Sequence, residues 1–274
     1  MIFVALGMLG LVFGSFVNAL VWRLHQQTRQ GKKQPASQKY SITRGRSMCP
    51  NCQHQLAPRD LIPVISWLML RGKCRYCHKK FADTPFSELA VPGLFVLSYA
   101  FWPLDWTTAG VMAFGLWLAL LVGFVALIIT DVRWYILPNR IIFPLQALAA
   151  GLATLHLLGF PDRSSLPQLI GGLLFSAGLL WVLHWVSKGQ WLGYGDVKLA
   201  VVIGLVLGRA DLALLMLFIA SLLGSLVAIP LMLAGKASHN SRIPFGPFLV
   251  VATIMTYLFG LSLTSWYTNR FLFL

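Results

Sequence analysis

Charged residues are scarce in this chain, and acidic residues are the scarcest. Only 11% of the 274 residues are charged, and eight Asp and Glu stand against 22 Lys and Arg. Hydrophobic residues make up 57% of the chain and its mean hydropathy is +0.73, values outside the range of soluble globular proteins. The composition therefore excludes a soluble protein and predicts a polytopic membrane protein.

Long runs without charge identify the expected membrane spans. A helix needs about 20 apolar residues to cross the hydrocarbon core of a bilayer. Six runs reach this length and two are shorter, at residues 1–22, 106–130, 141–161, 164–187, 212–235, 243–269, and then 89–104 and 199–208. We therefore predict an all-α fold with about eight transmembrane helices in a lipid bilayer.

The basic residues are distributed unevenly along the chain. Residues 23–80 contain 13 Lys or Arg and a single carboxylate, Asp60, so the positive-inside rule places this segment in the cytosol. With alternating spans, 19 of the 22 basic residues are cytosolic and both termini are periplasmic. Topology and anionic lipid headgroups then explain the net charge of +14, and no nucleic-acid partner is expected.

The first span has more polar residues than lipid contact requires. No basic region precedes it and Arg23 follows it, so an anchor helix is expected rather than a cleaved signal peptide. Gly14, Ser15 and Asn18 lie within this span. Close packing through small residues, with Asn18 bonded across a helix interface, is the simplest interpretation.

Cysteine is also scarce, and its placement is informative. The four cysteines form two CxxC motifs, Cys49/Cys52 and Cys74/Cys77, separated by 21 residues. Two such knuckles can supply four thiolates to one tetrahedral zinc ion. Two disulfides are the alternative, which a reducing cytosol disfavours. Because four thiolates leave no open coordination position, we predict a zinc-ribbon-like lobe with a structural ion between the first and second helices.

Two of the rare carboxylates lie at the ends of apolar runs. Asp131 closes the third span, and Asp196 stands in Gly-Tyr-Gly-Asp-Val-Lys-Leu before the short run at 199–208. Taken alone, Asp131 also fits a helix-end charge paired with Arg133, and the GxGD segment fits a simple turn. Alternating spans place both carboxylates at the cytosolic face, where two carboxylates sharing a proton can perform aspartyl-protease chemistry.

Two other classes of protein remain open at this point. A carboxylate-lined transporter would use buried acids for ions or protons, and an adaptor would use the zinc lobe for docking.

The segment Ile-Pro-Phe-Gly-Pro-Phe at 243–248 interrupts the entrance to the last span. Its prolines predict a fixed non-helical turn on the cytosolic side.

Six motifs together resemble one family. The chain contains GSFVN followed by Arg23, CPNC, IPVISWLMLRGKC, TD with LPN six residues on, GYGDVKL and IPFGPFL. In this order they resemble the bacterial type IV prepilin peptidase family. The resemblance implies a bifunctional inner-membrane enzyme of type IV pilus or type II secretion systems. Such an enzyme removes the leader from prepilins or pseudopilins at the cytosolic face and methylates the new N-terminus with S-adenosylmethionine.

The resemblance also implies site residues and a division of the chain. It assigns catalysis to Asp131 and Asp196, zinc to the four cysteines, and the methylation region to Glu88 and Gly93. The predicted parts are a first helix at 1–22, a basic cytosolic lobe at 23–85 and a membrane-embedded protease core at 86–274. Lys198 receives no role.

Three segments depart from the family pattern. They are Arg23-Leu24-His25, Leu137-Pro138-Asn139 and residues 81–86. In the second segment the family often has Asp at the position of Asn139. Because the third lies in the methylation region, a prepilin peptidase without methyltransferase activity is the alternative within the family.

Overall fold

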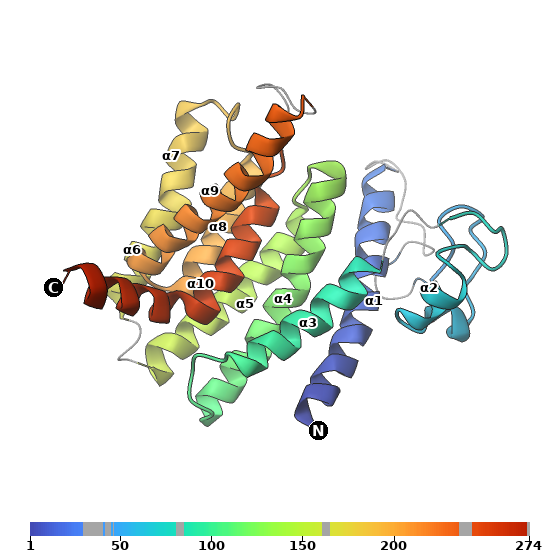
Figure 1. Cartoon of the computed structure of the whole chain (residues 1–274), viewed down its shortest axis with the longest axis horizontal. Helices are drawn as coiled ribbons and strands as arrows, with labels where there is room; N and C mark the ends of the chain where they lie inside the picture. The colour runs from blue at the N-terminus through green and yellow to red at the C-terminus, as the bar shows by residue number, and fades with distance from the viewer. Residues whose placement is uncertain are drawn as a thin grey trace. The chain divides into compact units, whose positions relative to one another are not determined.

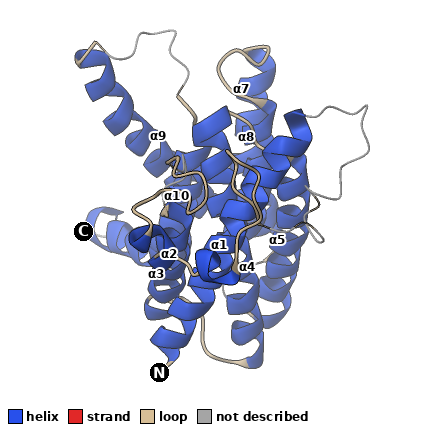
Figure 2. Ribbon diagram, turned by 90° about the vertical axis from the view of Figure 1, so that its right-hand side faces the viewer, coloured by secondary structure: helices blue, strands red, loops and turns tan. Residues whose placement is uncertain are grey.

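The computed structural model describes residues 1–29, 41, 45, 47–80, 85–160, 165–235 and 243–272. Every regular element among these residues is helical (Figure 2). Six helices are long and apolar enough to cross a membrane, which confirms the prediction of an all-α polytopic fold. The two shorter predicted runs also form helices, and the count of eight spans stays a prediction. Residues 30–40, 81–84 and 236–242 lie outside the described residues.

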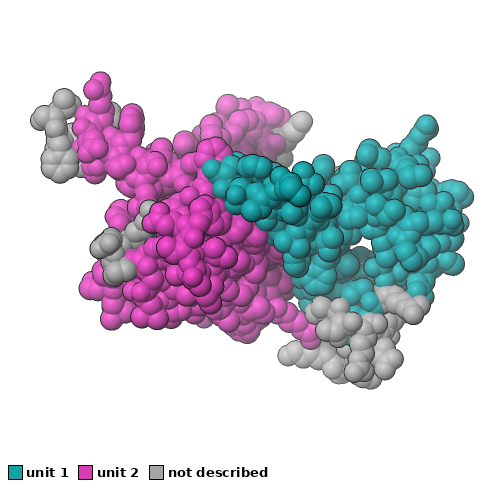
Figure 3. All heavy atoms as spheres, turned by 90° about the horizontal axis from the view of Figure 1, so that it is seen from below, with its two compact units in different colours: residues 1–100 teal, residues 101–274 magenta. Residues whose placement is uncertain are grey.

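The chain divides into two compact units, residues 1–100 and 101–274 (Figure 3). The first unit contains α1 (Ile2–Arg29), the short η2 (Pro58–Leu61), α2 (Ile65–Met69) and α3 (Phe86–Ala100). Helices α1 and α3 approach closely through small residues: Gly10 lies against Pro92, and Ser87 Oγ donates a hydrogen bond of 2.8 Å to the Gly14 carbonyl. The prediction of close packing by small residues in the first span is thus confirmed at Gly14. The three-part division of the chain stays a prediction.

The second unit is a bundle of helices (Figure 1). In chain order its elements are α4 (Thr108–Trp134), α5 (Asn139–Gly159), α6 (Leu166–Leu173), η3 (Leu174–Gly178), α7 (Leu179–Val186), α8 (Tyr194–Leu207), α9 (Ala210–Leu233), α10 (Gly246–Tyr267) and η4 (Thr268–Leu272). Helix α5 packs against both α4 and α8, and α10 contacts α4, α8 and α9. These contacts hold the C-terminal end of α4 and the N-terminal end of α8 in one bundle.

The interior of this bundle is filled by large apolar and aromatic side chains. Trp117, Phe124 and Ile203 are fully buried. Trp117 stacks on Tyr257 of α10 with ring centroids 4.1 Å apart, and the Tyr257 hydroxyl lies 3.2 Å from His156 Nε2. A buried tyrosine hydroxyl and a buried histidine ring each need a polar partner, so this contact allows Tyr257 and His156 both to lie inside the bundle.

A π-helical segment, η3, interrupts the helix formed by α6 and α7. Ser176 in this segment donates a hydrogen bond of 2.7 Å to the Gly172 carbonyl. Its hydroxyl and the Leu173 backbone lie where a Cβ on Gly204 of α8 would stand. Glycine at this position therefore permits α8 to pack directly against the interrupted span.

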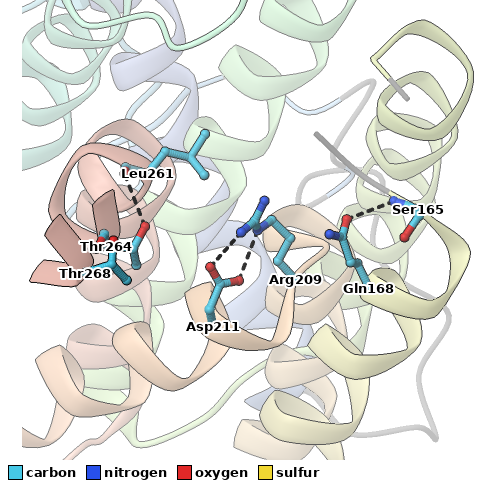
Figure 4. A network of polar contacts seen from close by, with 7 residues as sticks. All are labelled: Ser165, Gln168, Arg209, Asp211, Leu261, Thr264 and Thr268. Atoms are coloured by element: carbon cyan, nitrogen blue, oxygen red, sulfur yellow. Dashed lines mark hydrogen bonds and ion pairs between the residues drawn. The ribbon is translucent and has the colours of Figure 1, made fainter. Parts of the chain in front are cut away.

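The charges that follow α8 neutralise one another. Arg209 donates two hydrogen bonds, of 3.0 and 2.8 Å, to the carboxylate of Asp211 (Figure 4). In the same view, Gln168 accepts a hydrogen bond of 3.0 Å from the Ser165 backbone and caps the start of α6. Asp211 is thus committed to an ion pair at the end of α8 opposite Asp196.

Candidate active site and metal centre

Asp131 lies in the last turn of α4, where the long apolar helix ends. Tyr135 caps the helix in the left-handed conformation, at φ 55°, and its N–H donates to the Asp131 carbonyl. The side chain of Asp131 is buried with the residue 6% exposed. Its Oδ2 atom has no hydrogen-bond partner among the described residues. A buried carboxylate oxygen without a partner is costly, so this atom is available for a proton or a water molecule.

Asp196 lies in the first turn of α8 and is half-buried. Gly193 precedes the helix in an extended conformation and accepts a hydrogen bond of 3.1 Å from the Asp196 backbone. A Cβ on Gly195 would stand 3.0 Å from the Leu137 side chain. Glycine at position 195 of the GxGD motif therefore allows the chain after α4 to approach the start of α8 closely.

The two carboxylates converge on Gly246, the first residue of α10. A Cβ at this position would stand 2.5 Å from Asp131 Oδ2 and 3.6 Å from Asp196 Oδ1. The two oxygens therefore lie within about 6 Å of one another, the sum of those two distances. Pro247 in the first turn favours the start of a helix here. The segment at 243–248 thus places Gly246, a residue without a side chain, next to both carboxylates.

This arrangement has a direct chemical consequence. Both carboxylates lie close to the same point on Gly246, and two carboxylates in one low-dielectric site do not readily ionise together. Such a pair can share one proton. One carboxylate can then accept a proton while the other donates one, which is what acid–base cleavage of an amide requires.

Lys198 does not belong to this carboxylate pair. Its Nζ donates a hydrogen bond of 2.9 Å to Asn139 Oδ1 at the start of α5. It also lies 4.8 Å from the ring centroid of Tyr194 and 5.8 Å from that of Phe143. The lysine thus connects α8 to α5, a tertiary contact that sequence reasoning did not predict.

The four cysteines come together in the first unit. Their Sγ atoms all lie within 4.8 Å of one another, and those of Cys49 and Cys77 are 3.9 Å apart. Sulfur atoms on a tetrahedral zinc ion, with bonds of about 2.3 Å, stand about 3.8 Å apart. All four thiols are free. The cluster can therefore bind a metal ion, and the spacing and donor set fit zinc.

Both knuckles have the same backbone geometry. In the first, Cys49 exchanges backbone hydrogen bonds with His54 and Gln53; in the second, Cys74 does so with Lys79 and His78. The residue after each second cysteine has positive φ, 57° at Gln53 and 54° at His78. Each knuckle is therefore a tight local turn that orients two sulfur atoms.

Protein groups alone do not keep the Cys49 sulfur charged. Burial raises the pKa of the Cys49 thiol to about 12. A bound cation would hold this sulfur as a thiolate, since coordinated thiols lose their protons. At Cys49, ion binding and loss of the thiol proton would therefore be coupled.

Asp60 joins the segment between the knuckles to the second knuckle. Its carboxylate accepts hydrogen bonds of 2.7 Å from Arg75 Nε, 3.3 Å from the Tyr76 hydroxyl and 3.3 Å from the Ala57 N–H. Burial opposes ionisation, but these donors outweigh it and lower the pKa of Asp60. Sequence reasoning assigned Asp60 no role, although a single carboxylate among 13 basic residues was the available signal.

Glu88 and Gly93 do not share a site. Glu88, at the start of α3, accepts a hydrogen bond of 2.6 Å from the Val64 backbone. Gly93 is exposed, and a Cβ there would meet no atom within 4 Å among the described residues. The structure therefore connects Glu88 to the lobe and leaves Gly93 on an open helix surface.

Comparisons with known proteins agree with this architecture. A family model described as Bacterial Peptidase A24 N-terminal domain matches residues 8–102, and one described as Type IV leader peptidase family matches residues 117–229. The Prepilin leader peptidase/N-methyltransferase of Stutzerimonas stutzeri is 32% identical, with 94% of this chain and 91% of that protein covered. The protein of the same name from Aeromonas hydrophila is 32% identical, covering 96% of this chain and 92% of the relative.

A third relative carries a different name. The Type 4 prepilin-like proteins leader peptide-processing enzyme of Escherichia coli O78:H11 is 32% identical, with 90% of each chain covered. No solved structure matches the chain. Fold and sites define a multi-pass membrane protein with two clustered carboxylates and a four-cysteine centre. The chain belongs to the type IV leader peptidase family.

Proposed function

We propose that this protein removes the leader peptide from type IV prepilins or type II secretion pseudopilins, using Asp131 and Asp196. The observation that carries the proposal is the convergence of both carboxylates on Gly246, within about 6 Å of one another. The names of the relatives support the same substrate class.

The proposed reaction is hydrolysis of one amide bond. The ionised carboxylate takes a proton from a water molecule, whose oxygen adds to the scissile carbonyl carbon, while the protonated carboxyl donates its proton to the carbonyl oxygen. The C–N bond then breaks as a proton returns to the nitrogen. The products are the leader acid and a free N-terminal amine, and the pair again holds one proton.

The proposed topology delivers the substrate to this site. A prepilin joins a basic leader to an apolar helix, so its helix enters the bilayer while the leader stays in the cytosol. We place the protein in the bacterial inner membrane, with both termini periplasmic and the segment at 23–85 cytosolic. Asp131 and Asp196 then stand at the cytosolic boundary, where the scissile bond arrives. The basic residues of the lobe serve topology and anionic lipids.

We also propose that the protein methylates the new N-terminus. The relatives named Prepilin leader peptidase/N-methyltransferase favour this second activity. S-adenosylmethionine would supply a methyl group to the free amine, which loses a proton. The four cysteines would bind a structural zinc ion that holds the two knuckles together, leaving no open position for a substrate.

Single substitutions separate these proposals. Purified protein is incubated with a prepilin and labelled S-adenosylmethionine, and leader removal and label transfer are measured separately. We expect Asp131→Asn and Asp196→Asn each to abolish leader removal and Asp105→Asn, at an exposed carboxylate, to leave it unchanged. Near-normal cleavage by either variant would contradict the carboxylate pair. Cleavage by the wild type without label transfer would select the peptidase without methyltransferase activity.

Methylation is also tested independently of cleavage. A mature pilin with a free N-terminal amine is offered to the Asp196→Asn variant. We expect label transfer to this acceptor, because the variant lacks only the peptidase acid.

A further inference from the structure

The segment between the two knuckles presents an exposed apolar surface. Along η2 and α2 it consists of five large side chains with exposed fractions between 39% and 75%, namely Leu61, Ile62, Ile65, Leu68 and Met69. Contiguous apolar patches with a polar rim mark sites of protein or membrane interaction. The segment is too short to cross a bilayer, which takes about 20 residues in a helix. A role at the membrane boundary remains open to it.

Helix α2 divides its side chains between two faces. The exposed residues Ile65, Leu68 and Met69 follow the i, i+3, i+4 spacing of a single helix face. Ser66 and Trp67 are turned the other way and line an internal cavity of the first unit. The interior of the lobe therefore explains the inward face of α2 and leaves the outward face without a structural role.

The exposed apolar part of α1 ends where the lobe begins. Large exposed apolar side chains extend from the N-terminus as far as Phe16, whereas Val17 and Val21 are buried. Just before this change, the Gly14 carbonyl accepts the hydrogen bond from Ser87 in the first turn of α3. The end of the lipid-facing part of α1 therefore lies at the level of the start of α3, and we take this level as the membrane boundary of the first unit.

A hydrogen bond fixes α2 at the same level. The N–H of Val64, the residue directly before α2, donates a hydrogen bond of 2.6 Å to Glu88 in the first turn of α3. Val64 has φ 59° and ψ −48°, a conformation that a β-branched residue rarely adopts, and such strain persists where the surrounding structure fixes it. Phe86 and Leu89 in this turn of α3 are also exposed. The apolar surface of the lobe thus begins beside exposed apolar side chains of α3.

Basic side chains flank the apolar surface at both ends of the segment. Arg59 precedes it and Arg71 and Lys73 follow it, all three at exposed positions. None of the three forms an ion pair with another described residue. The one carboxylate in the segment, Asp60, is bonded to Arg75. Exposed apolar side chains beside uncompensated positive charge complement a bilayer with anionic headgroups.

We propose that the apolar surface of the lobe inserts into the cytosolic leaflet of the bilayer, while Arg59, Arg71 and Lys73 bind anionic lipid headgroups. The inference goes beyond leader removal and methylation, and it rests on the proposed function only for the cytosolic placement of residues 23–85. Amphipathic segments of this kind reach about 5–10 Å into the boundary between headgroups and acyl chains. A prepilin leader is the less suitable occupant, because it is basic and so are all three flanking charges.

Photo-crosslinking from the lipid tests insertion directly. The full chain is reconstituted in bilayer nanodiscs that contain a phospholipid with a diazirine in its acyl chain, irradiated and digested with trypsin. Cleavage after Arg59 and Arg71 releases residues 60–71 as one peptide that contains the whole apolar surface. We expect label in 60–71 and in 1–23, the membrane-spanning control, but not in 47–59, the peptide of the first knuckle. Label in 1–23 without label in 60–71 would overturn the proposal.

Substitution of the apolar side chains should remove this label. We expect the double variant Leu68→Asn, Met69→Asn to lower labelling of 60–71 about fivefold and to leave labelling of 1–23 unchanged. The matched control is Leu158→Asn in α5, at a side chain that is 86% exposed, which should label like the wild type. Undiminished labelling of the double variant would count against insertion. Asp196→Asn should lose leader removal and label normally, so this inference and the proposed peptidase site fail separately.

Lipid composition tests the contact with headgroups. We expect phosphatidylglycerol, added to phosphatidylcholine nanodiscs, to raise labelling of 60–71 about twofold, and high salt or Lys73→Gln to reduce this gain. Equal labelling in both bilayers would overturn the headgroup contact. Displacement of the label from 60–71 by added prepilin would assign the surface to a protein partner and overturn the proposal. A reversed topology would leave the labelling intact, because an acyl-chain probe reports depth in the bilayer and not the side.

Discussion

The two sites of this protein are assembled in opposite ways. The cysteine cluster is built from two short turns, each closed by backbone hydrogen bonds within six residues. The carboxylate pair is built from three helix ends, at Asp131, Asp196 and Gly246, that are far apart in the chain. The first is a local site that needs an ion to join its halves. The second is a site made by packing, whose geometry depends on the whole bundle.

This difference decides how each site fails. A local turn keeps its shape when its partner is lost. The two knuckles contact each other through the rings of His54 and Tyr76, 3.8 Å apart, and through the Asn51 side-chain amide, which donates a hydrogen bond of 3.5 Å to the Lys80 carbonyl. No local turn fixes the positions of the two carboxylates relative to each other, so small changes in helix packing move them directly.

Metal removal should have the largest effect, and it should be confined to the lobe. Binding of a structural zinc ion by four thiolates contributes about 10–16 kcal/mol in isolated zinc-finger peptides. We expect a strong chelator, or Cys74→Ser, to abolish the protection of residues 47–80 in hydrogen–deuterium exchange. Protection in α4 and α8 should persist, since no cysteine lies in the second unit. Loss of protection throughout the chain would contradict the independence of the two sites.

Removal of both carboxylates should be no worse than removal of one. Loss of a general acid or base lowers the rate about 10²–10⁴-fold. We expect Asp131→Asn, Asp196→Asn and the double variant to have equally low kcat, because residues that act as a unit are not additive. Progressive loss in the double variant would show that the two acids act separately.

The sequence was sufficient for the local site and insufficient for the packed one. CxxC spacing predicted the cluster because each knuckle is determined by a few adjacent residues. Charge-free runs predicted the long helices for the same reason. Alternating spans predicted that Asp131 and Asp196 lie on one side of the membrane, but no periodicity indicated that both would converge on Gly246. Nor did it indicate that Lys198 would bind Asn139 or that Glu88 would bind Val64, because these contacts depend on tertiary packing.

Gly246→Ala tests the carboxylate site without replacing either aspartate. The added methyl would stand 2.5 Å from Asp131 Oδ2, so the carboxylate or the start of α10 must move. Misplacement of about 1 Å can lower a rate about 10²-fold, and we expect kcat for leader removal to fall 10- to 100-fold. The control is Gly115→Ala, where a Cβ would meet no described atom within 4 Å. Equal activity in the two variants would contradict the convergence on Gly246.

Asp60→Asn tests the lobe by a smaller change. Asparagine keeps the shape but loses the charge that Arg75 neutralises, so we expect the lobe to lose about 1–2 kcal/mol of stability. The folded-state pKa of Asp60 is lowered. The stability difference between the variant and the wild type is therefore complete above the ordinary Asp pKa of about 3.9 and disappears as the pH falls through the lowered folded-state pKa. Hydrogen–deuterium exchange of the knuckle amides measures this stability difference. A variant difference that grows on acidification would contradict the assignment.

Substitution of Lys198 should have the smallest effect on stability, and substitution of its partner Asn139 should change stability in the opposite direction. Lys198→Met removes the hydrogen bond to Asn139 and the contact with the Tyr194 ring. We expect a loss of stability below about 1 kcal/mol, as for other exposed polar contacts, and a kcat within about twofold of the wild type, since the lysine does not contact either acid. Asn139→Asp would turn the same contact into an ion pair and should raise the melting temperature slightly. In the Lys198→Met background this gain should vanish, because the new carboxylate then has no cation to pair with. A large loss of kcat in Lys198→Met with unchanged stability would instead place the lysine in the reaction and extend the packed site to α5.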